Sequence, residues 1–236
     1  MKTGTIGIIG GMGPLATADL FQKIIQNTRA SCDQEHLHIL IDNNTAIPDR
    51  TAALLHGGAD PFPQMLESAL RLEEDGADCL LMPCNTAHYF HGQLQERVHI
   101  PLLNMLELTC QALKRRGITR AGLLATTGTI ETGIYQRAAQ KLQVELLLPT
   151  PEEQTWVMDL IYQGVKAGDP NYDPKRVQCV IDRLLTQRGA QAVILGCTEL
   201  PLAVQMYRIQ APCVDPTLEL AKGAIRQAGG VLCRQD

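Results

Sequence analysis

Two cysteines, Cys84 and Cys197, occupy closely similar positions in the two halves of this 236-residue chain. Each follows a turn of small residues and a continuous apolar run of the kind that forms a buried parallel strand, and each precedes amide or hydroxyl side chains. Each thiol is therefore expected at the carboxyl end of a strand, where open parallel sheets bind their ligands. Because a thiolate removes a proton and a thiol returns one, two matched thiols predict symmetric proton transfer at a shared site.

The similarity between the two halves extends beyond the cysteines. Cys197 follows Cys84 by 113 residues, and the glycines that open the two turns are separated by the same distance. Apolar runs near residues 5–10 and 100–104 recur 115 and 111 residues later in the chain. Three runs that recur in one order at nearly constant spacing favour a duplicated α/β half, and hence two similar domains.

Composition restricts the classes of function. The net charge is −4 and the sequence has no basic stripe, which argues against a nucleic-acid partner. No apolar run reaches membrane-spanning length and no signal-peptide core follows Met1, so a soluble, cytoplasmic protein without a membrane partner is expected. The eight cysteines include no CxxC pair and no zinc-ligand spacing, which indicates reduced thiols and no metal site.

Hydrophobic periodicity predicts alternating strands and helices. Strands are expected at 5–10, 37–41, 78–83, 101–103, 120–125, 144–148, 191–196 and 213–214. Helices are expected at 15–29, 61–75, 86–97, 105–116, 131–141, 152–167, 174–188, 199–206 and 216–229. The polar segment 42–51 is predicted as a loop, and 168–174 as either a lid beside the site or an ordinary surface turn.

The element order predicts an α/β protein with two lobes and parallel sheets. The first lobe is expected to comprise residues 1–105 and 216–236 and to carry Cys84. The second is expected to comprise residues 106–215 and to carry Cys197.

Four short motifs point to a known family. They are Gly-Gly-Met-Gly-Pro-Leu-Ala-Thr at 10–17, Pro-Asp-Arg-Thr at 48–51, Pro-Cys-Asn-Thr-Ala-His at 83–88 and Gly-Cys-Thr-Glu-Leu at 196–200. In this order, and across essentially the whole chain, they resemble the aspartate racemases of the Asp/Glu racemase family. The resemblance implies two flavodoxin-like domains related by pseudo-two-fold symmetry, an active site in the cleft between them, no cofactor and a homodimer. It also implies that the two cysteines interconvert L- and D-aspartate.

The same resemblance assigns residues that bind the substrate's side-chain carboxylate. Arg50 and, by a weaker match, Lys166 correspond to them. A guanidinium matches a carboxylate in a two-pronged geometry, which favours aspartate as the substrate. The alternative for Arg50 is a surface arginine that caps Asp49, and the alternative for Lys166 is a solvated helical lysine.

Polar groups beside the cysteines are candidates for binding the α-carboxylate and the developing enolate. Asn85, Thr86 and Thr198 are expected to serve this purpose, although Thr86 and Thr198 could simply cap helices. Met12 in the glycine-rich first turn and Thr126, at the corresponding place in the second half, are further candidates. A cysteine that acts as a base near neutrality needs a pKa about one to two units below the ordinary value of about 8.5, and nearby amides and helix N-termini are expected to contribute this lowering.

Two other polar residues have more than one interpretation. In glutamate racemases a histidine typically stands where this chain has Glu199, and the departure argues against glutamate as the substrate. Glu199 either assists Cys197 or opens a helix at which acids are favoured. His88 is expected to make a structural polar contact rather than to act as a base.

Other functions fit parts of the pattern. A maleate-isomerase-like enzyme would keep the cysteine pair but add one thiol to a double bond, and a racemase of broader amino-acid specificity would keep the proton transfer. The glycine-rich first turn also suggests a nucleotide or anion sensor, but its spacing does not match G-x-G-x-x-G.

Overall fold

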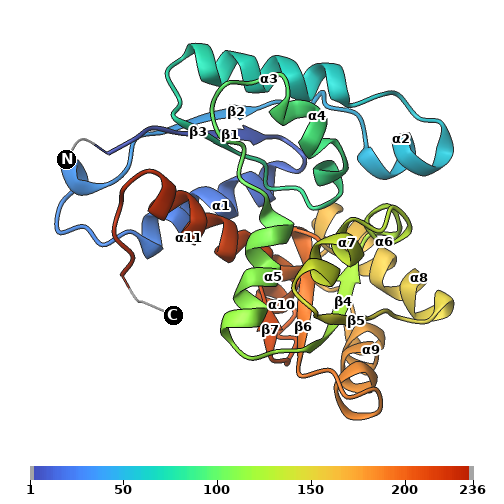
Figure 1. Ribbon diagram of the computed structural model, residues 1–236. Coiled ribbons are helices and arrows are strands. Elements are labelled where there is room, and N and C mark those ends of the chain that lie inside the picture. Colours follow the sequence, from blue (N-terminus) through green and yellow to red (C-terminus); the bar gives the residue numbers. More distant parts are fainter. Residues whose placement is uncertain (1–2, 234–236) are drawn as a thin grey trace. The chain divides into compact units, whose positions relative to one another are not determined.

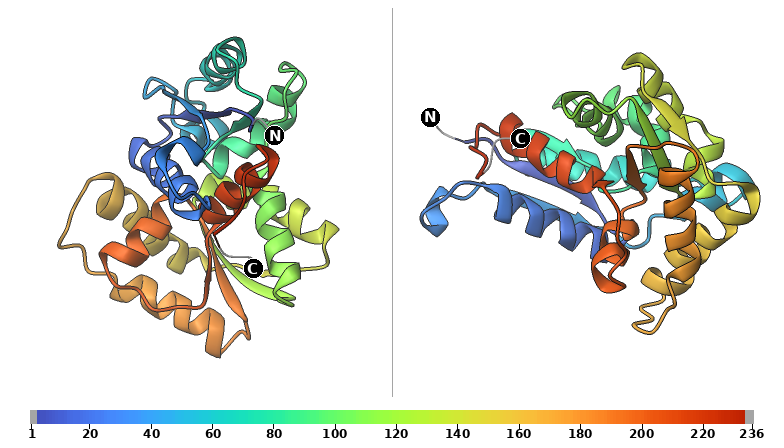
Figure 2. Two further views of the ribbon diagram at one scale, coloured as in Figure 1. Left: turned by 90° about the vertical axis from the view of Figure 1, so that its left-hand side faces the viewer. Right: turned by 90° about the horizontal axis from the view of Figure 1, so that it is seen from below.

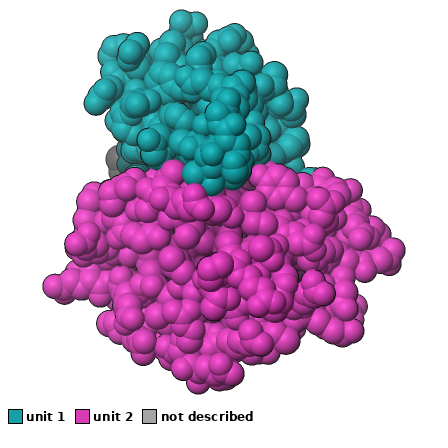
Figure 3. All heavy atoms as spheres, turned by 90° about the vertical axis from the view of Figure 1, so that its right-hand side faces the viewer, with its two compact units in different colours: residues 1–105, 217–236 teal, residues 106–216 magenta. Residues whose placement is uncertain are grey.

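The computed structural model describes residues 3–233 and divides into two compact units, coloured separately in Figure 3. Unit 1 comprises residues 1–105 and 217–236, and unit 2 comprises residues 106–216. Unit 2 is therefore inserted in the sequence between two segments of unit 1. Each unit has its own parallel sheet with helices on both faces, so the α/β fold expected from the sequence is confirmed (Figure 1).

Unit 1 is built on a three-stranded parallel sheet in the order β2-β1-β3. Helices α3 and α4 lie on one face, and α1 and α11 lie side by side on the other (Figures 1 and 2). The strands are β1 (Ile6–Gly10), β2 (Ile39–Asn43) and β3 (Cys79–Leu81). The helices are α1 (Pro14–Asn27), α2 (Arg50–His56), α3 (Phe62–Glu74), α4 (His91–Gln95) and α11 (Pro216–Gln227), with short 3₁₀ segments η1 (Asp33–Glu35) and η2 (Thr86–Phe90).

Unit 2 is built on a four-stranded parallel sheet in the order β5-β4-β6-β7. The strands are β4 (Arg120–Ala125), β5 (Glu145–Leu147), β6 (Ala192–Gly196) and β7 (Cys213–Val214). The helices are α5 (Met105–Arg115), α6 (Thr127–Glu131), α7 (Ile134–Lys141), α8 (Pro151–Asp159), α9 (Lys175–Thr186) and α10 (Glu199–Met206), and a π-helical segment η3 (Leu160–Lys166) continues α8. Among the described residues, no helix combines the length and hydrophobicity needed to cross a membrane.

The two sheets share strand order and register, as expected of a duplication. In each unit the first strand lies between the second and the third, which is the flavodoxin-like order. The corresponding pairs across the repeat are Ile8–Leu81 with Leu123–Ile194, and Leu80–Leu102 with Val193–Cys213. The strand expected at 101–103 is reduced to a single bridge at Leu102, because only this residue pairs with β3.

Burial on both faces explains why the central strands read as continuous apolar runs. In β6, Val193 and Leu195 belong to the core beneath α8, η3, α9 and α10, whereas Ala192 and Ile194 belong to the core beneath α5 and α7. Successive side chains of a strand point to opposite faces, so each face receives every second residue. In unit 1 the same alternation places Leu80, Met82 and Cys84 in one core cluster.

Some expected elements differ in the structure. The segment 42–51, predicted as a loop, contains the start of α2, because Asp49 accepts a hydrogen bond from the Ala52 N–H at 2.8 Å and thereby caps this helix. The helix expected at 86–97 is η2 followed by α4. The helix expected at 131–141 is divided at Gly133, whose φ of 65° separates α6 from α7.

Candidate active site

The candidate residues of unit 1 lie at the carboxyl ends of β1 and β3. These strands are neighbours, and the chain continues from β1 into a glycine-rich turn and from β3 into Pro83 and Cys84. In a flavodoxin-like sheet this position is the switch point at which ligands bind. The turn and the cysteine are therefore placed where the sequence predicted a site.

Glycine is required at position 11 of this turn. Gly11 has a φ of +90°, and a Cβ atom there would lie 2.3 Å from the backbone carbonyl carbon of Asn44. The Gly11 N–H donates to the Thr17 hydroxyl at 3.0 Å, and that hydroxyl donates to the Gly13 carbonyl at 3.0 Å. The turn is thus held between α1 and the loop that follows β2.

Arg50 is buried rather than on the surface, with 7% of its area exposed. Its guanidinium donates to the carbonyl oxygens of Met12 at 2.7 Å and Pro48 at 2.9 Å, and more distantly to that of Ile47 at 3.4 Å. The surface position that the alternative interpretation gave to Arg50 is therefore wrong. Arg50 ties the loop before α2 to the glycine-rich turn and stands beside Met12 at the strand ends.

Cys84 is buried and its backbone is fixed from both directions. Its N–H donates to the Met82 carbonyl at 2.8 Å, and its carbonyl lies 2.8 Å from His88 Nδ1. Asn85 and Thr86 are also buried, at the start of η2, and the Asn85 side chain does not cap that segment. The turn therefore presents buried amide and hydroxyl groups directly beside the thiol.

Cys197 in unit 2 is also buried, but its thiol has a carboxylate partner. The Cys197 Sγ donates to Glu199 Oε2 at 2.9 Å, and the Thr198 hydroxyl donates to the same oxygen at 3.3 Å. Burial raises the pKa of Cys197 well above its ordinary value, the charge of Glu199 raises it further, and the charge of Lys166 opposes the shift. Cys197 is consequently a protonated thiol at neutral pH.

The surroundings of Cys197 differ from the sequence-based expectations about its pKa and about the role of Thr198. The expectation that the pKa of Cys197 is lowered is wrong, because desolvation and Glu199 outweigh the start of α10. Thr198 occupies the N-cap position of α10 without capping it through its side chain, since its hydroxyl is directed at Glu199. Capping alone therefore does not explain this threonine.

Lys166 and Thr126 flank this region of unit 2. Lys166 is the last residue of η3, and its Nζ lies 4.5 Å from the centre of the Tyr162 ring. Segment η3 packs against α10, and π-helical segments frequently occur at functional sites. The Thr126 side chain caps α6, accepting from the Thr129 N–H at 3.3 Å, at the carboxyl end of β4.

Hydrogen bonds from two tyrosine hydroxyls connect the loop 168–174 to the adjacent segments. The Tyr172 hydroxyl donates to Asp159 Oδ2 at 2.7 Å, and the Tyr207 hydroxyl donates to the Asp169 carbonyl at 2.6 Å. The two rings lie 5.7 Å apart. These contacts tie the loop to α8 and to the end of α10, which favours the interpretation as an ordinary surface turn.

Each unit thus carries five of the ten candidate residues, and all of them except Lys166, which ends η3, lie in segments that follow a strand. In unit 1 they are Met12, Arg50, Cys84, Asn85 and Thr86; in unit 2 they are Thr126, Lys166, Cys197, Thr198 and Glu199. Sequence reasoning missed the structural partners that fix these residues, notably Thr17 and the carbonyl partners of Arg50. The signal for Thr17 in the sequence was its position one helical turn after the glycines, from which its hydroxyl reaches their backbone. Among residues 3–233, no cluster of three or more His, Cys, Asp or Glu side chains could hold a metal ion.

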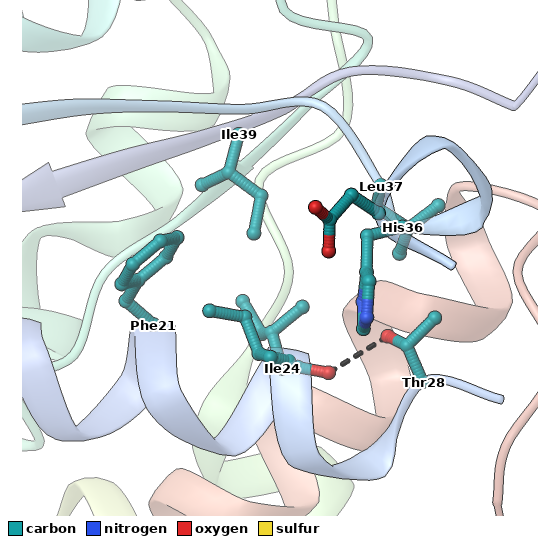
Figure 4. A pocket seen from close by; sticks show the side chains of 8 residues that line it. Phe21, Ile24, Thr28, His36, Leu37 and Ile39 are labelled. Atoms are coloured by element: carbon teal, nitrogen blue, oxygen red, sulfur yellow. Dashed lines mark hydrogen bonds between the residues drawn. The ribbon is translucent and has the colours of Figure 1, made fainter. Parts of the chain in front are cut away.

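A surface cavity of about 290 Å³ lies elsewhere in unit 1. As Figure 4 shows, Phe21 and Ile24 of α1 face Ile39 across it, and the Thr28 hydroxyl at its edge donates to the Ile24 carbonyl at 2.7 Å. Ile39 is the first residue of β2, so the cavity lies at the amino end of this strand. It is separate from the candidate residues, which lie at the carboxyl ends.

Comparisons with known proteins agree with the fold. Residues 9–224 match the family model described as Asp/Glu/hydantoin racemase. The structure is similar to the aspartate racemase of Picrophilus torridus, with a TM-score of 0.85 and 33% identity over 97% of this chain and 96% of that one. A broad-specificity amino-acid racemase, RacX of Bacillus subtilis, is 25% identical over 93% of this chain and 96% of its own length. A glutamate racemase of Pseudomonas aeruginosa is 25% identical over 98% of this chain and 83% of its own length.

An α/β fold with one flavodoxin-like parallel sheet in each of two units is the fold of the two-domain racemases of this kind. The chain belongs to the Asp/Glu/hydantoin racemase family. It is therefore a racemase of this family, and amino acids are its class of substrate.

Proposed function

We propose that the protein racemises aspartate without a cofactor, with Cys84 and Cys197 exchanging the α-proton on opposite faces of the substrate. The observation that carries this proposal is the repeated placement of a buried cysteine beyond the carboxyl end of the third strand of each sheet, at equivalent positions of the repeat. The similarity to an aspartate racemase over nearly the whole chain supports the choice of substrate.

The proton balance assigns complementary roles to the two sulfur atoms. The Cys84 thiolate takes the proton from Cα of one enantiomer and becomes a thiol, while the Cys197 thiol delivers its proton to the other face and becomes a thiolate. For the opposite enantiomer the roles are exchanged. Because Cys197 rests as a thiol that donates to Glu199, we assign it the role of acid in the resting protein.

Charged and polar groups near each cysteine would bind the two carboxylates. Asn85, Thr86 and Thr198 are proposed to donate to the α-carboxylate, whose charge grows as the enolate forms. Met12, Thr126 and Glu199 are proposed to shape the pocket around it. Their burial supports this proposal, since hydrogen bonds to charge are stronger where water is excluded.

Arg50 and Lys166 are proposed to hold the side-chain carboxylate of aspartate. Arg50 already donates to backbone carbonyls, so its guanidinium is oriented before substrate binds. Replacing Arg50 with Lys should raise KM for aspartate more than it lowers kcat, because a point charge loses the two-pronged geometry. Steady-state kinetics with aspartate and alanine would check this, and an equal loss for both substrates would contradict the assignment.

The direct test is an assay in deuterated water. Incubation of the purified protein with L-aspartate should yield D-aspartate that carries deuterium at Cα, and D-aspartate should yield labelled L-aspartate. The double variant Cys84→Ala/Cys197→Ala is the matched control. If neither inversion nor label appears with the native protein, the proposed function is wrong.

Broader amino-acid specificity is the second candidate, because RacX of Bacillus subtilis matches almost the full chain. The same deuterium assay with a panel of L-amino acids distinguishes the two. A preference for acidic amino acids supports aspartate, and similar rates across apolar and basic amino acids support the broader activity.

We also propose that the protein is a cytoplasmic homodimer. All eight cysteines are free thiols, as the reducing cytoplasm would keep them. Leu15 of α1 and Ile41 of the edge strand β2 expose much of their apolar surface, which a second copy would cover. Analytical ultracentrifugation would check the dimer, and a monomer at micromolar concentration would exclude it.

A further inference from the structure

His88 makes a hydrogen bond with each of its ring nitrogens and is almost fully buried, with 5% of its area exposed. Nδ1 lies 2.8 Å from the Cys84 carbonyl, and Nε2 lies 3.0 Å from the backbone nitrogen of Met105. The Met105 N–H can only donate, so Nε2 accepts and Nδ1 carries the proton. One imidazole therefore connects the Cys84 backbone to the first residue of α5.

The electrostatic environment keeps this ring neutral. Burial lowers the pKa of His88 to about 4 and the neighbouring His91 adds to the shift, whereas the carbonyls of Cys84 and Leu103, which would accept from the doubly protonated ring, oppose it. Above this pH, Nε2 retains the lone pair that accepts from Met105. The arrangement of donor and acceptor is therefore constant through the neutral range.

A second histidine binds the same connecting segment without touching Cys84. The His91 ring stacks on His88 with centres 5.7 Å apart and planes 15° apart. Its Nε2 lies 2.8 Å from the Leu102 carbonyl. The segment from Leu102 to Met105 is thus held by two adjacent rings, and only His88 extends the contact to the cysteine.

We propose that His88 is a positioning residue that fixes Cys84 by joining its carbonyl to the Met105 amide at the start of α5. This rests on the proposed function, in which Cys84 exchanges the α-proton. Two residues separate β3 from Cys84, and the Cys84 N–H donates back to the carbonyl of one of them, Met82. The hydrogen bond with His88 Nδ1, at 2.8 Å, holds the Cys84 carbonyl on the side that faces η2.

The proposal predicts a specific kinetic pattern. His88 bonds to backbone groups, so its loss should displace the sulfur of Cys84 and leave in place Arg50 and Lys166, which are proposed to bind the side-chain carboxylate. Misplacement of a reacting group by about 1 Å can cost about 100-fold in rate. His88→Phe, which retains an aromatic ring and removes both hydrogen bonds, should lower kcat by about 10- to 100-fold and change KM for aspartate much less.

Two further variants separate the two hydrogen bonds. In His88→Asn the amide can replace Nδ1 and donate to the Cys84 carbonyl, whereas in His88→Gln the longer amide can replace Nε2 and accept from Met105. His91→Phe is the matched control, because it removes a contact to the same segment without a bond to Cys84. The Asn variant should retain more activity than the Gln variant, and the His91 variant should keep a kcat within about twofold of the native value.

A readout independent of activity is the rate at which each thiol reacts with iodoacetamide, measured peptide by peptide by mass spectrometry. Cys84 should react several-fold faster in His88→Phe and His88→Gln than in the native protein or in His88→Asn. Cys197 should keep its native rate, and the exposed thiol of Cys179 provides the reference. Equal increases at Cys84 and Cys197, or an unchanged rate at Cys84, would overturn the proposal.

The Asn and Gln variants differ by one methylene, so their comparison remains decisive if His88→Phe fails to fold. Failure of the proposed function would appear separately, as an absence of racemisation by the native protein. In that case the alkylation rates still decide whether His88 positions Cys84.

Discussion

The turn that carries Cys84 and the turn that carries Cys197 are built on the same backbone plan but differ in the groups that surround the sulfur. Both follow the third strand of a flavodoxin-like sheet in equivalent register. In unit 1 a neutral histidine holds the cysteine's carbonyl, whereas in unit 2 a carboxylate accepts a hydrogen bond from the thiol itself. The backbone of the duplication is preserved, and the side chains have diverged.

This difference teaches that similar strand ends do not make the two thiols chemically equivalent. A carboxylate beside Cys197 disfavours the thiolate, and nothing comparable in residue type follows Cys84, where Asn85 and Thr86 occupy the corresponding places. Reversible racemisation needs two groups that exchange protons, but it does not need them to rest in the same protonation state. The experiments that follow test how far the asymmetry extends.

The largest effect is expected from removing either sulfur. Cys84→Ser and Cys197→Ser should each lower racemisation by about 10²- to 10⁴-fold, because a hydroxyl is a far poorer base than a thiolate. Circular dichroism of aspartate solutions measures the rate, and Cys179→Ser at an exposed site is the control. Near-native racemisation by either catalytic variant would remove that cysteine from the mechanism.

The glycine-rich turn offers a test of the scaffold that differs between the units. Position 11 is glycine in unit 1, while Thr126 occupies the corresponding position of unit 2 with an ordinary φ of −67°. Gly11→Ala should destabilise the protein by about 3 kcal/mol, because it adds a clash with Asn44 to the strain of a positive φ.

Gly76→Ala is the matched control for this substitution. Gly76 has nearly the same φ, +92°, with open space around the added methyl group, so it should cost only about 1 kcal/mol. Urea unfolding gives both free energies. If both variants lose the same free energy of unfolding, the clash with Asn44 does not contribute to the destabilisation.

The smallest effect is expected from neutralising the carboxylate beside Cys197. The charge of Glu199 raises the pKa of Cys197, so Glu199→Gln should allow this thiol to ionise at lower pH. The pH dependence of Cys197 alkylation should shift downwards, with a loss in kcat of about tenfold. Glu152→Gln, on the exposed first turn of α8, should leave the profile unchanged. An upward shift in Glu199→Gln would contradict the assigned role.

The sequence predicted most of the sheet because the relevant information is local. Continuous apolar runs place β1, β4 and β6 within one residue of their observed bounds, and the turn glycines set the register of the repeat. Strand β2 begins two residues later than expected, at Ile39, because it is an edge strand with an exposed face and a weaker apolar pattern. Helix α2 was not predicted, although Asp49 is a residue type that caps helices, because the segment before it is polar and was read as part of one loop.

The candidate site was only partly predictable, because its chemistry depends on side-chain directions. Residue types and spacing identify both cysteines as candidates and the family resemblance adds Arg50, but they do not show that Arg50 is buried against the Met12 carbonyl. They also leave open whether the Glu199 side chain is directed at Cys197 or at the start of α10. The structure shows that it accepts a hydrogen bond from Cys197. The π-helical end of α8 likewise has no signature in a periodicity of 3.6 residues.

The insertion of unit 2 within unit 1 has a consequence for the order in which the protein folds during synthesis. Unit 1 is completed by α11 and the residues after it, since Gly4 N–H donates to the Ala228 carbonyl and Arg29 N–H donates to the Val231 carbonyl. These partners are synthesised only after the whole of unit 2 has been translated. The sheet that carries Cys84 therefore lacks α11 on one face throughout the synthesis of unit 2, and chaperones would meet the nascent chain in that state.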